Sequence, residues 1–263
     1  MKLSVITINF NNKEGLAKTI VSVVGQTTRD FEWIIIDGGS TDGSMELIEN
    51  NSEYISYYVS EPDKGIYNAM NKGIMASHGE YLLFLNSGDY LYGENVIKQV
   101  IPLLKDKDIY VGRINSVGRE NATEAEQADF SPEGILRKLT FTWIPHQASF
   151  FKRTLFDKYG LYREDQRIAS DWWGYFNSLV IGNATIASLS HIIANYDVGG
   201  ISATQYYMAV QEQENILKEH PQIDVLYRFY RDWLEIVESL KSNRFVFLLF
   251  RFYFFLYRKL SKK

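Results

Sequence analysis

The sequence predicts an α/β fold with a mostly parallel central sheet and helices on both of its faces. In the first hundred residues, short apolar runs alternate with stretches whose apolar residues recur at helical spacing. This alternation of strand and helix is typical of parallel strands joined by right-handed crossovers. A chain of 263 residues, 46% of them hydrophobic, is long enough to bury such a sheet.

The predicted elements follow one another closely up to residue 104 and more loosely beyond it. Strands are predicted over residues 3–8, 32–37, 55–60 and 81–86, and helices over 16–24, 45–49, 66–75 and 96–104. In the second half, strands are predicted over 109–114, 148–151, 185–189 and 193–196, helices over 171–179 and 203–219, and a loop or ribbon over 115–129. Pro221 is expected to end the helix predicted over 203–219, because proline disrupts the interior of a helix.

Composition and charge exclude several classes of function. The chain contains no cysteine, which excludes a disulfide framework, a thiolate nucleophile and a zinc finger. Seven of the 28 basic residues lie after residue 240 with no acid among them, which leaves 21 basic against 32 acidic residues before that point. An acidic body argues against a nucleic-acid binder. The apolar start of the chain is too short for a secretory signal, so we expect a cytoplasmic protein.

Polar residues follow the predicted strands of the first half. Asn9 and Asn11, Asp37, Asp63 and Asp89 come after four apolar runs in turn. Successive parallel strands bring their carboxyl ends to one edge of a sheet, where α/β proteins bind ligands. Carboxylates gathered there are suited to a divalent cation and a diphosphate. The alternative for each residue taken alone is a turn or helix-cap role.

Four segments carry a family resemblance. They are Ser4–Asn11, Trp33–Gly43, Glu61–Ile74 and Gly79–Asp89, in this order. Their sequences resemble the successive motifs of the family 2 glycosyltransferases, above all of bacterial members that build capsule, colanic-acid-like or lipopolysaccharide chains. The resemblance implies a GT-A fold, a nucleotide-sugar donor that is most often a UDP-sugar, a divalent Mn²⁺ or Mg²⁺ on its diphosphate, and transfer with inversion.

The resemblance also implies roles for individual residues. Asp171 matches the family's general base, with a helix N-cap as the alternative. Asp89 is the implied metal ligand, and His146, Gln147 and Trp172 are the implied acceptor-side residues. The positions implied for the donor are Ile8, Asn9, Asn11, Asp37, Gly38, Asp63, Lys64, Gly65, Asn86, Ser87 and Gly88.

Two positions depart from the family pattern. Many relatives carry a second acid after the second strand, where this chain has Gly38, which leaves Asp37 to contact the base or ribose. The usual metal motif appears as Asn86-Ser87-Gly88-Asp89, with a single carboxylate. Two rival functions therefore stay open: a non-catalytic sugar-nucleotide-binding scaffold protein, and a sugar nucleotidyltransferase. The segment after the first strand lacks the glycine-rich loop with Arg and Lys that the second rival requires.

The resemblance implies a division of the chain into a transferase domain and an extension. Residues 1–202 form the expected GT-A domain, with a nucleotide-sugar-binding half at 1–104 and an acceptor half at 105–202. Residues 203–263 form the expected helical extension.

The extension ends in a basic and aromatic segment. Arg244, Arg251 and Arg258 recur every seven residues among phenylalanine, tyrosine and leucine. This spacing predicts that residues 244–260 form a helix lying in the membrane interface, with packing on the body or across a homodimer as the alternatives. We therefore expect the protein at the inner face of the plasma membrane, beside a lipid-linked or saccharide acceptor.

Overall fold

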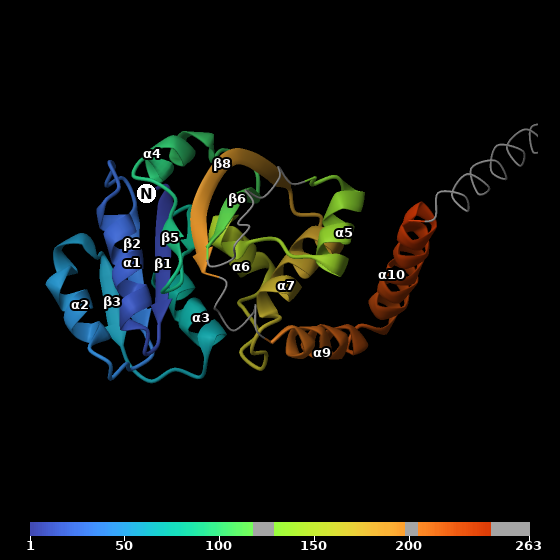
Figure 1. Ribbon diagram of the computed structural model, residues 1–263, viewed down its shortest axis with the longest axis horizontal. Helices are drawn as coiled ribbons and strands as arrows, with labels where there is room; N and C mark the ends of the chain where they lie inside the picture. The colour runs from blue at the N-terminus through green and yellow to red at the C-terminus, as the bar shows by residue number, and fades with distance from the viewer. Residues whose placement is uncertain (118–128, 198–204, 243–263) are drawn as a thin grey trace, which may run out of the picture. The chain divides into compact units, whose positions relative to one another are not determined.

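The structure is a computed structural model that describes residues 1–117, 129–197 and 205–242 (Figure 1). The chain divides into two compact units, Met1–Gln213 and Glu214–Lys263. The central sheet and all of the predicted site residues belong to the first unit.

An eight-stranded sheet forms the centre of the first unit in the described part of the chain. Its strands are β1 (Leu3–Asn9), β2 (Glu32–Asp37), β3 (Tyr57–Ser60), β4 (Tyr81–Phe84), β5 (Tyr90–Leu91), β6 (Ile109–Val117), β7 (Ser149–Lys152) and β8 (Ile186–Asp197). Their order is β3-β2-β1-β4-β7-β6-β8-β5. The first four strands pair in parallel, as do β6 and β8, whereas β7 and β5 run antiparallel to their neighbours. The mostly parallel sheet is therefore confirmed.

The reversed direction of β7 does not follow from the sequence pattern, and it matters for the site. Because β7 is antiparallel to β4, the amino end of β7 lies at the carboxyl end of β4. The short helix η3 (His146–Ala148) directly precedes β7. The topology therefore brings the start of η3 to the edge where β1, β2 and β4 end.

Helices flank the sheet on both faces, as predicted (Figure 1). Leu16 of α1 and Ile48 of α2 share a buried core with Leu3 of the first strand. On the other face, a Cβ at Gly73 of α3 would lie only 2.4 Å from Cγ2 of Ile6, so glycine allows α3 to approach the sheet closely. The helices of the first half are α1 (Lys13–Val24), α2 (Ser44–Asn50), η1 (Ser52–Tyr54), α3 (Ile66–Ala76), α4 (Val96–Val100) and η2 (Ile101–Leu103).

The second half departs from the sequence prediction in three places. The helices α5 (Pro132–Phe141) and α6 (Thr154–Tyr159) were not expected, although Ser131 caps α5 by accepting a hydrogen bond from the Gly134 N–H at 3.1 Å. The two strands predicted over 185–196 form one strand, β8, whose pairing with β6 contains register shifts near Arg113. Such irregularities bend a strand and increase its local twist. The remaining elements are α7 (Ser170–Tyr175), the π-helical stretch η4 (Phe176–Ile181) and α9 (Tyr206–Lys218).

The helix α10 (Pro221–Ser242) lies in the second unit and begins at Pro221, as a proline at the first position of a helix favours. Its large apolar side chains Val225, Phe229, Trp233 and Ile236 are exposed. No helix in the described ranges is both long and apolar enough to cross a membrane. The predicted interfacial helix at 244–260 lies outside the described residues.

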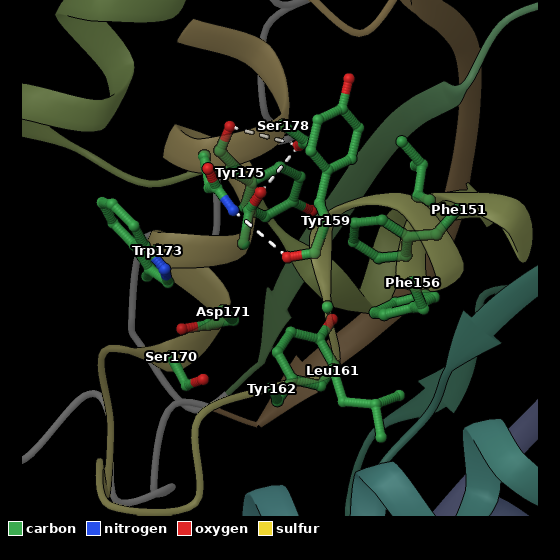
Figure 2. Close-up of a pocket in the computed structure, with 14 residues that line it drawn as sticks. Phe151, Phe156, Tyr159, Leu161, Tyr162, Ser170, Asp171, Trp173, Tyr175 and Ser178 are labelled. Carbon is green, nitrogen blue, oxygen red and sulfur yellow. Dashed lines mark hydrogen bonds between the residues drawn. The ribbon is translucent and has the colours of Figure 1, made fainter. Parts of the chain in front are cut away.

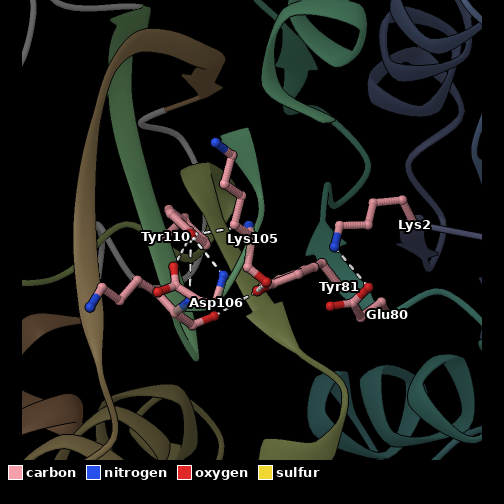
Figure 3. Close-up of polar contacts among 7 residues, drawn as sticks. Lys2, Glu80, Tyr81, Lys105, Asp106 and Tyr110 are labelled. Carbon is pink, nitrogen blue, oxygen red and sulfur yellow. Dashed lines mark hydrogen bonds and ion pairs between the residues drawn. The ribbon is translucent and has the colours of Figure 1, made fainter. Parts of the chain in front are cut away.

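Two tyrosines hold the turn that separates the predicted halves of the domain (Figure 3). The Tyr81 hydroxyl donates to the carbonyl oxygens of Lys105 and Lys107, at 3.2 and 2.7 Å. The Tyr110 hydroxyl accepts hydrogen bonds from the backbone N–H groups of Lys105, Asp106 and Lys107. Because burial disfavours the phenolate, the pKa of Tyr81 is raised and its hydroxyl stays a donor. The turn therefore has a fixed position at the edge opposite the site.

A buried carboxylate fixes the same opposite edge. Glu32 accepts hydrogen bonds from Ser4 Oγ at 2.5 Å and from the backbone N–H groups of His78 and Gly79 at 2.5 and 2.9 Å. Burial alone raises the pKa of the Glu32 carboxyl, but these hydrogen bonds outweigh it and hold the pKa below its ordinary value.

Glu32→Gln is expected to lower the free energy of unfolding at pH 7 by about 1–3 kcal/mol, because all three donors bind Oε1 and a neutral amide oxygen accepts weaker hydrogen bonds than an ionised carboxylate. The pKa of Glu32 is lower in the folded state, so its contribution is complete above the ordinary value of 4.5 and is lost as the pH falls through the folded value. Urea denaturation at pH 7 and at pH 4 should show the difference between wild type and variant shrinking with acid. An equal difference at both pH values would contradict this, and the exposed Glu53→Gln serves as the control.

Candidate active site

The loop after β2 is built around the carboxylate of Asp37. This residue has no exposed surface and accepts hydrogen bonds from Asn9 Nδ2 at 2.8 Å, from the Ser60 hydroxyl at 2.6 Å, and from the Ser40 hydroxyl and N–H at 2.6 and 2.8 Å. Burial alone raises the pKa of the Asp37 carboxyl, but the hydrogen bonds hold it below its ordinary value. Asp37 therefore shapes the loop and orients Asn9, and its predicted contact with a base or ribose stays a prediction.

A second carboxylate occupies the space beside Gly38. A Cβ at Gly38 would lie 2.6 Å from Oδ2 of Asp63 and 3.1 Å from Cδ2 of Phe10. The other oxygen of Asp63 accepts the Gly65 N–H at 2.8 Å, which fixes the carboxylate in this position. The Phe10 ring is 63% exposed. The absence of a side chain at position 38 thus places an acid and an exposed aromatic ring side by side.

The neighbouring residues of this loop region are placed as follows. Asn11 has a positive φ of 47° and accepts the Thr41 N–H through Oδ1 at 2.8 Å. Lys64 is exposed, and Gly65 precedes α3 with a φ of 118°, a conformation that glycine adopts readily. Ile8 is buried in β1, and its carbonyl oxygen accepts the Ser87 N–H at 3.0 Å. The end of β1 and the turn after β4 therefore meet at the carboxyl edge of the sheet.

A threonine of α1 fixes the turn after β4 through hydrogen bonds. The Gly88 N–H donates to Thr19 Oγ1 at 3.1 Å, and the Thr19 hydroxyl donates to the Asp89 carbonyl oxygen at 2.7 Å. Gly88 has a φ of 105°, a conformation that glycine adopts readily and that other residues rarely adopt. Asp89 itself is 6% exposed.

Two buried amide oxygens lie at the ends of adjacent strands. Oδ1 of Asn9 and Oδ1 of Asn86 have no hydrogen-bond partner within the described parts of the chain. Buried polar atoms are nearly always satisfied, so these two oxygens are free to accept hydrogen bonds from water or to bind a ligand at this edge. In the described ranges, no three His, Asp or Glu side chains gather as a metal site.

Asp171 lies at the start of α7 and is only partly exposed. Its Oδ1 accepts the Tyr67 hydroxyl at 3.0 Å and the Trp172 N–H at 2.8 Å, and its Oδ2 lies 3.3 Å from Nδ1 of His146. The N-cap of α7 is Ala169, so Asp171 lies within the first turn and the N-cap alternative is wrong.

His146 connects Asp171 to the turn after β4. Its Nε2 lies 3.4 Å from Nδ2 of Asn86, on the side of the ring opposite Asp171. The two ring nitrogens of His146 thus face two different polar groups, the Asp171 carboxylate at Nδ1 and the Asn86 amide at Nε2. The reversed strand β7 makes this contact possible, because it brings His146 to the carboxyl end of β4. The structure therefore joins Asp171, His146 and Asn86 in one polar chain.

An aromatic pocket opens beside Asp171 (Figure 2). Ser170, Asp171 and Trp173 of α7 lie on one side of it, opposite Phe151 and Phe156. The tryptophan of α7 that reaches the pocket is thus Trp173.

The predicted acceptor-side residues Trp172 and Gln147 are both buried. Trp172 donates its Nε1–H to the Leu139 carbonyl oxygen of α5 at 2.7 Å, which places its indole in the core, and its acceptor-side role stays a prediction.

The structure also shows residues that the sequence analysis missed. Tyr67 contacts Asp171, and Asn71 donates to the Tyr162 carbonyl oxygen at 2.8 Å and to Glu164 at 3.0 Å. Tyr67 and Asn71 are four residues apart on α3, so helical spacing alone places them on one face. The motif Glu61–Ile74 therefore reaches the residues before α7. Glu212 of α9 binds the same segment, and no sequence signal points to it.

Comparison with solved structures identifies the fold. TarS 1–349 of S. aureus, in a crystal structure with UDP-GlcNAc, superposes with a TM-score of 0.63 at 19% identity, over 75% of this chain and 58% of that one. The mannosyltransferase PcManGT from Pyrobaculum calidifontis, in complex with GDP-Man and Mn²⁺, gives a TM-score of 0.56 at 17% identity, over 78% of this chain and 59% of that one. The fold is that of the GT-A glycosyltransferases.

Comparison of sequences identifies the family. The model described as Glycosyl transferase family 2 matches residues 4–160, more than half of the chain. The protein therefore belongs to glycosyltransferase family 2. An uncharacterized glycosyltransferase of Mycobacterium tuberculosis is 38% identical over 172 residues, which make up 64% of this chain and 65% of that protein. The match spans just under two thirds of that relative.

Proposed function

We propose that this protein transfers a sugar from a nucleoside diphosphate sugar to a hydroxyl group of a saccharide or lipid-linked acceptor, with inversion at the anomeric carbon. The observation that carries the proposal is the polar chain from Asp171 through His146 to Asn86, which links a carboxylate that lines an aromatic pocket to the carboxyl edge of the sheet. The family match, together with the resemblance of the four motifs to those of bacterial members of the family, favours a role in the synthesis of a surface polysaccharide.

Asp171 is the general base of the proposed reaction. The acceptor hydroxyl oxygen forms a bond to the anomeric carbon while the bond from that carbon to the diphosphate oxygen breaks. The hydroxyl proton passes to Asp171, and the nucleoside diphosphate leaves from the opposite face of the sugar. His146 and Tyr67 hold the carboxylate in place through its two oxygens. Trp173, which lines the pocket and is partly exposed, is suited to pack against an acceptor sugar.

The family implies a divalent metal. The turn after β4 offers two side chains that could hold one, which is fewer than a complete set of protein ligands. Asp89 offers a carboxylate, and Asn86 offers a buried amide oxygen with no partner in the described ranges. Mg²⁺ is commonly held by one or two carboxylates together with substrate phosphates. When bound, the metal neutralises charge on the departing diphosphate.

Phe10 and Asp63 form the proposed base-recognition pair. The exposed Phe10 ring offers a stacking surface, and the Asp63 carboxylate beside it accepts a hydrogen bond from a ring N–H such as that of uracil. TarS binds UDP-GlcNAc in its crystal structure, which supports a UDP-sugar as the donor.

Gly38→Asp is expected to destabilise the protein by about 1–3 kcal/mol, because its Cβ and carboxylate would meet the Asp63 carboxylate. The double variant Gly38→Asp/Asp63→Gly removes the clash and returns one acid to the same place. We therefore expect it to recover the melting temperature and most of the UDP affinity, measured by calorimetry. If the double variant is no more stable than Gly38→Asp alone, Asp63 does not occupy this space.

Release of nucleoside diphosphate from a panel of sugar donors tests the proposed function. A transferase liberates UDP from its donor, with Mn²⁺ or Mg²⁺ raising the rate, and the donor raises the melting temperature because it binds the folded state. A scaffold protein would show the stabilisation without release. A nucleotidyltransferase would instead form pyrophosphate from a nucleoside triphosphate and a sugar phosphate. Either result would overturn the proposal.

The C-terminal extension is the proposed membrane contact, at the inner face of the plasma membrane. Exposed apolar side chains on α10 precede the end of the chain, where seven basic and no acidic residues follow Leu240 in the sequence. Apolar side chains beside a run of basic ones are typical of segments that lie on a membrane surface.

Truncation after Ser242 is expected to abolish binding to vesicles that contain anionic lipid, and added salt should weaken binding of the full chain. Sedimentation with vesicles measures both effects. Unchanged binding of the shortened protein would contradict the proposal, and a change in oligomeric state alone would indicate a dimer contact instead.

A further inference from the structure

The segment before α7 is held by a carboxylate from a distant helix. Three consecutive backbone N–H groups converge on Glu212 of α9. Arg167 donates to Oε1 at 2.9 Å, and Ile168 and Ala169 donate to Oε2 at 2.9 and 3.0 Å. Hydrogen bonds to an ionised carboxylate are about twice as strong as those between neutral groups. Glu212 therefore fixes the backbone that leads into the first turn of α7.

The same segment is also held by α3, through a different backbone group. The Tyr67 hydroxyl lies 2.5 Å from the Ile168 carbonyl oxygen and 3.0 Å from Oδ1 of Asp171, and these two acceptors share its single proton. Residue 168 is thus bound at its N–H by Glu212 and at its carbonyl by Tyr67, three residues before Asp171. Asp171 lies in the first turn of α7, where the backbone N–H groups have no partner within the helix. The position of Asp171 therefore depends on these outside contacts.

We propose that Glu212 is a positioning residue of the transferase, which sets the place of the Asp171 carboxylate and makes turnover depend on the contact between α9 and the segment before α7. The proposal rests on the proposed role of Asp171 as the base. Within the described ranges, the hydrogen bonds of Glu212 go to residues 167–169, and Glu212 is not among the residues that line the pocket of Figure 2. Its loss should therefore lower kcat and leave donor binding unchanged, since small misplacement of a catalytic group slows the chemical step.

The test compares Glu212→Ala and Glu212→Gln with Glu214→Gln, which removes the same charge from the same helix. We expect Glu212→Ala to lower kcat about tenfold or more with donor Kd within about twofold, and Glu212→Gln, which keeps an acceptor oxygen, to lie between it and wild type. Glu214→Gln should behave as wild type. Wild-type kcat in Glu212→Ala would overturn the proposal.

A double-variant cycle separates positioning from general destabilisation. In an Asp171→Asn background there is no base left to misplace, so adding Glu212→Ala should have little further effect on the residual rate. If instead Glu212→Ala lowers the residual rate by the same factor as in wild type, its effect does not pass through Asp171 and the proposal fails.

Amide hydrogen exchange tests the contact between Glu212 and residues 167–169 without any measurement of activity. The N–H groups of residues 167–169 should exchange faster in Glu212→Ala, and unchanged exchange would overturn the proposed contact whatever the activity. If wild type releases no nucleoside diphosphate from any donor while exchange at these positions rises, the proposed function and the catalytic part of this inference fail together and the contact alone stands.

Discussion

Asp171→Asn is expected to lower the rate of nucleoside diphosphate release about 10²- to 10⁴-fold, the usual contribution of a positioned general base. The amide keeps the shape of the side chain and can still accept from the Tyr67 hydroxyl and the Trp172 N–H, so the start of α7 should be preserved. It cannot take the acceptor proton. Donor affinity should therefore stay within about twofold of wild type, because only the chemical step is affected.

The measurements are steady-state release of UDP and calorimetric binding of UDP to both proteins. Asp165→Asn is the matched control, since Asp165 is an acid of the same segment that pairs with Arg163 at 2.7 Å and lies away from the polar chain. Activity near the wild-type level in Asp171→Asn would exclude Asp171 as the base. His146, which shares the polar chain, would then be the next candidate.

Asp89→Ala is expected to lower turnover about 10²- to 10³-fold, as does the removal of other groups that stabilise charge in a transition state. Asp89 is the single carboxylate of the turn after β4, so its loss should also remove the response of the rate to Mn²⁺ or Mg²⁺. Titration of each metal against wild type and variant measures this response. The melting temperature must be compared as well, because Asp89 is nearly buried.

Asp89→Asn keeps the shape of the side chain and separates the loss of charge from a packing defect. The exposed Asp30→Asn controls for a change in net charge. If Asp89→Asn retains both full activity and the full metal response, Asp89 does not hold the metal. A fully active variant with no metal response in either protein would instead identify a metal-independent transferase.

The polar chain has a consequence for how the two halves of the domain work together. Asn86 belongs to the half predicted to bind the donor, and Asp171 belongs to the half predicted to bind the acceptor, with His146 between them. A donor that engages the Asn86 amide would act on the same ring that orients Asp171. Because the two ring nitrogens of His146 face these two groups, a shift of the ring toward one of them changes its distance from the other.

Much of the donor edge could be predicted from the sequence, because its determinants are local. An apolar run followed by a polar turn fixes both a buried strand and the edge at which the strand ends, and parallel pairing brings those ends together. Asn9, Asn11, Asp37, Asp63 and Asp89 are predicted at one edge in this way. What no local pattern could reveal is that Asp37 has no exposed surface, or that Asp63 fills the space beside Gly38.

The sequence by itself determined the α/β class, the parallel strands of the first half and the candidate base, since these depend on periodicity and on motifs that are continuous in the chain. The tertiary structure alone decided what surrounds that base. The reversal of β7 brings His146 to the end of β4, and contacts between residues about a hundred and about forty-five positions apart bring Tyr67 and Glu212 to the segment before α7. Such contacts depend on the direction and packing of whole elements, for which local sequence carries no signal.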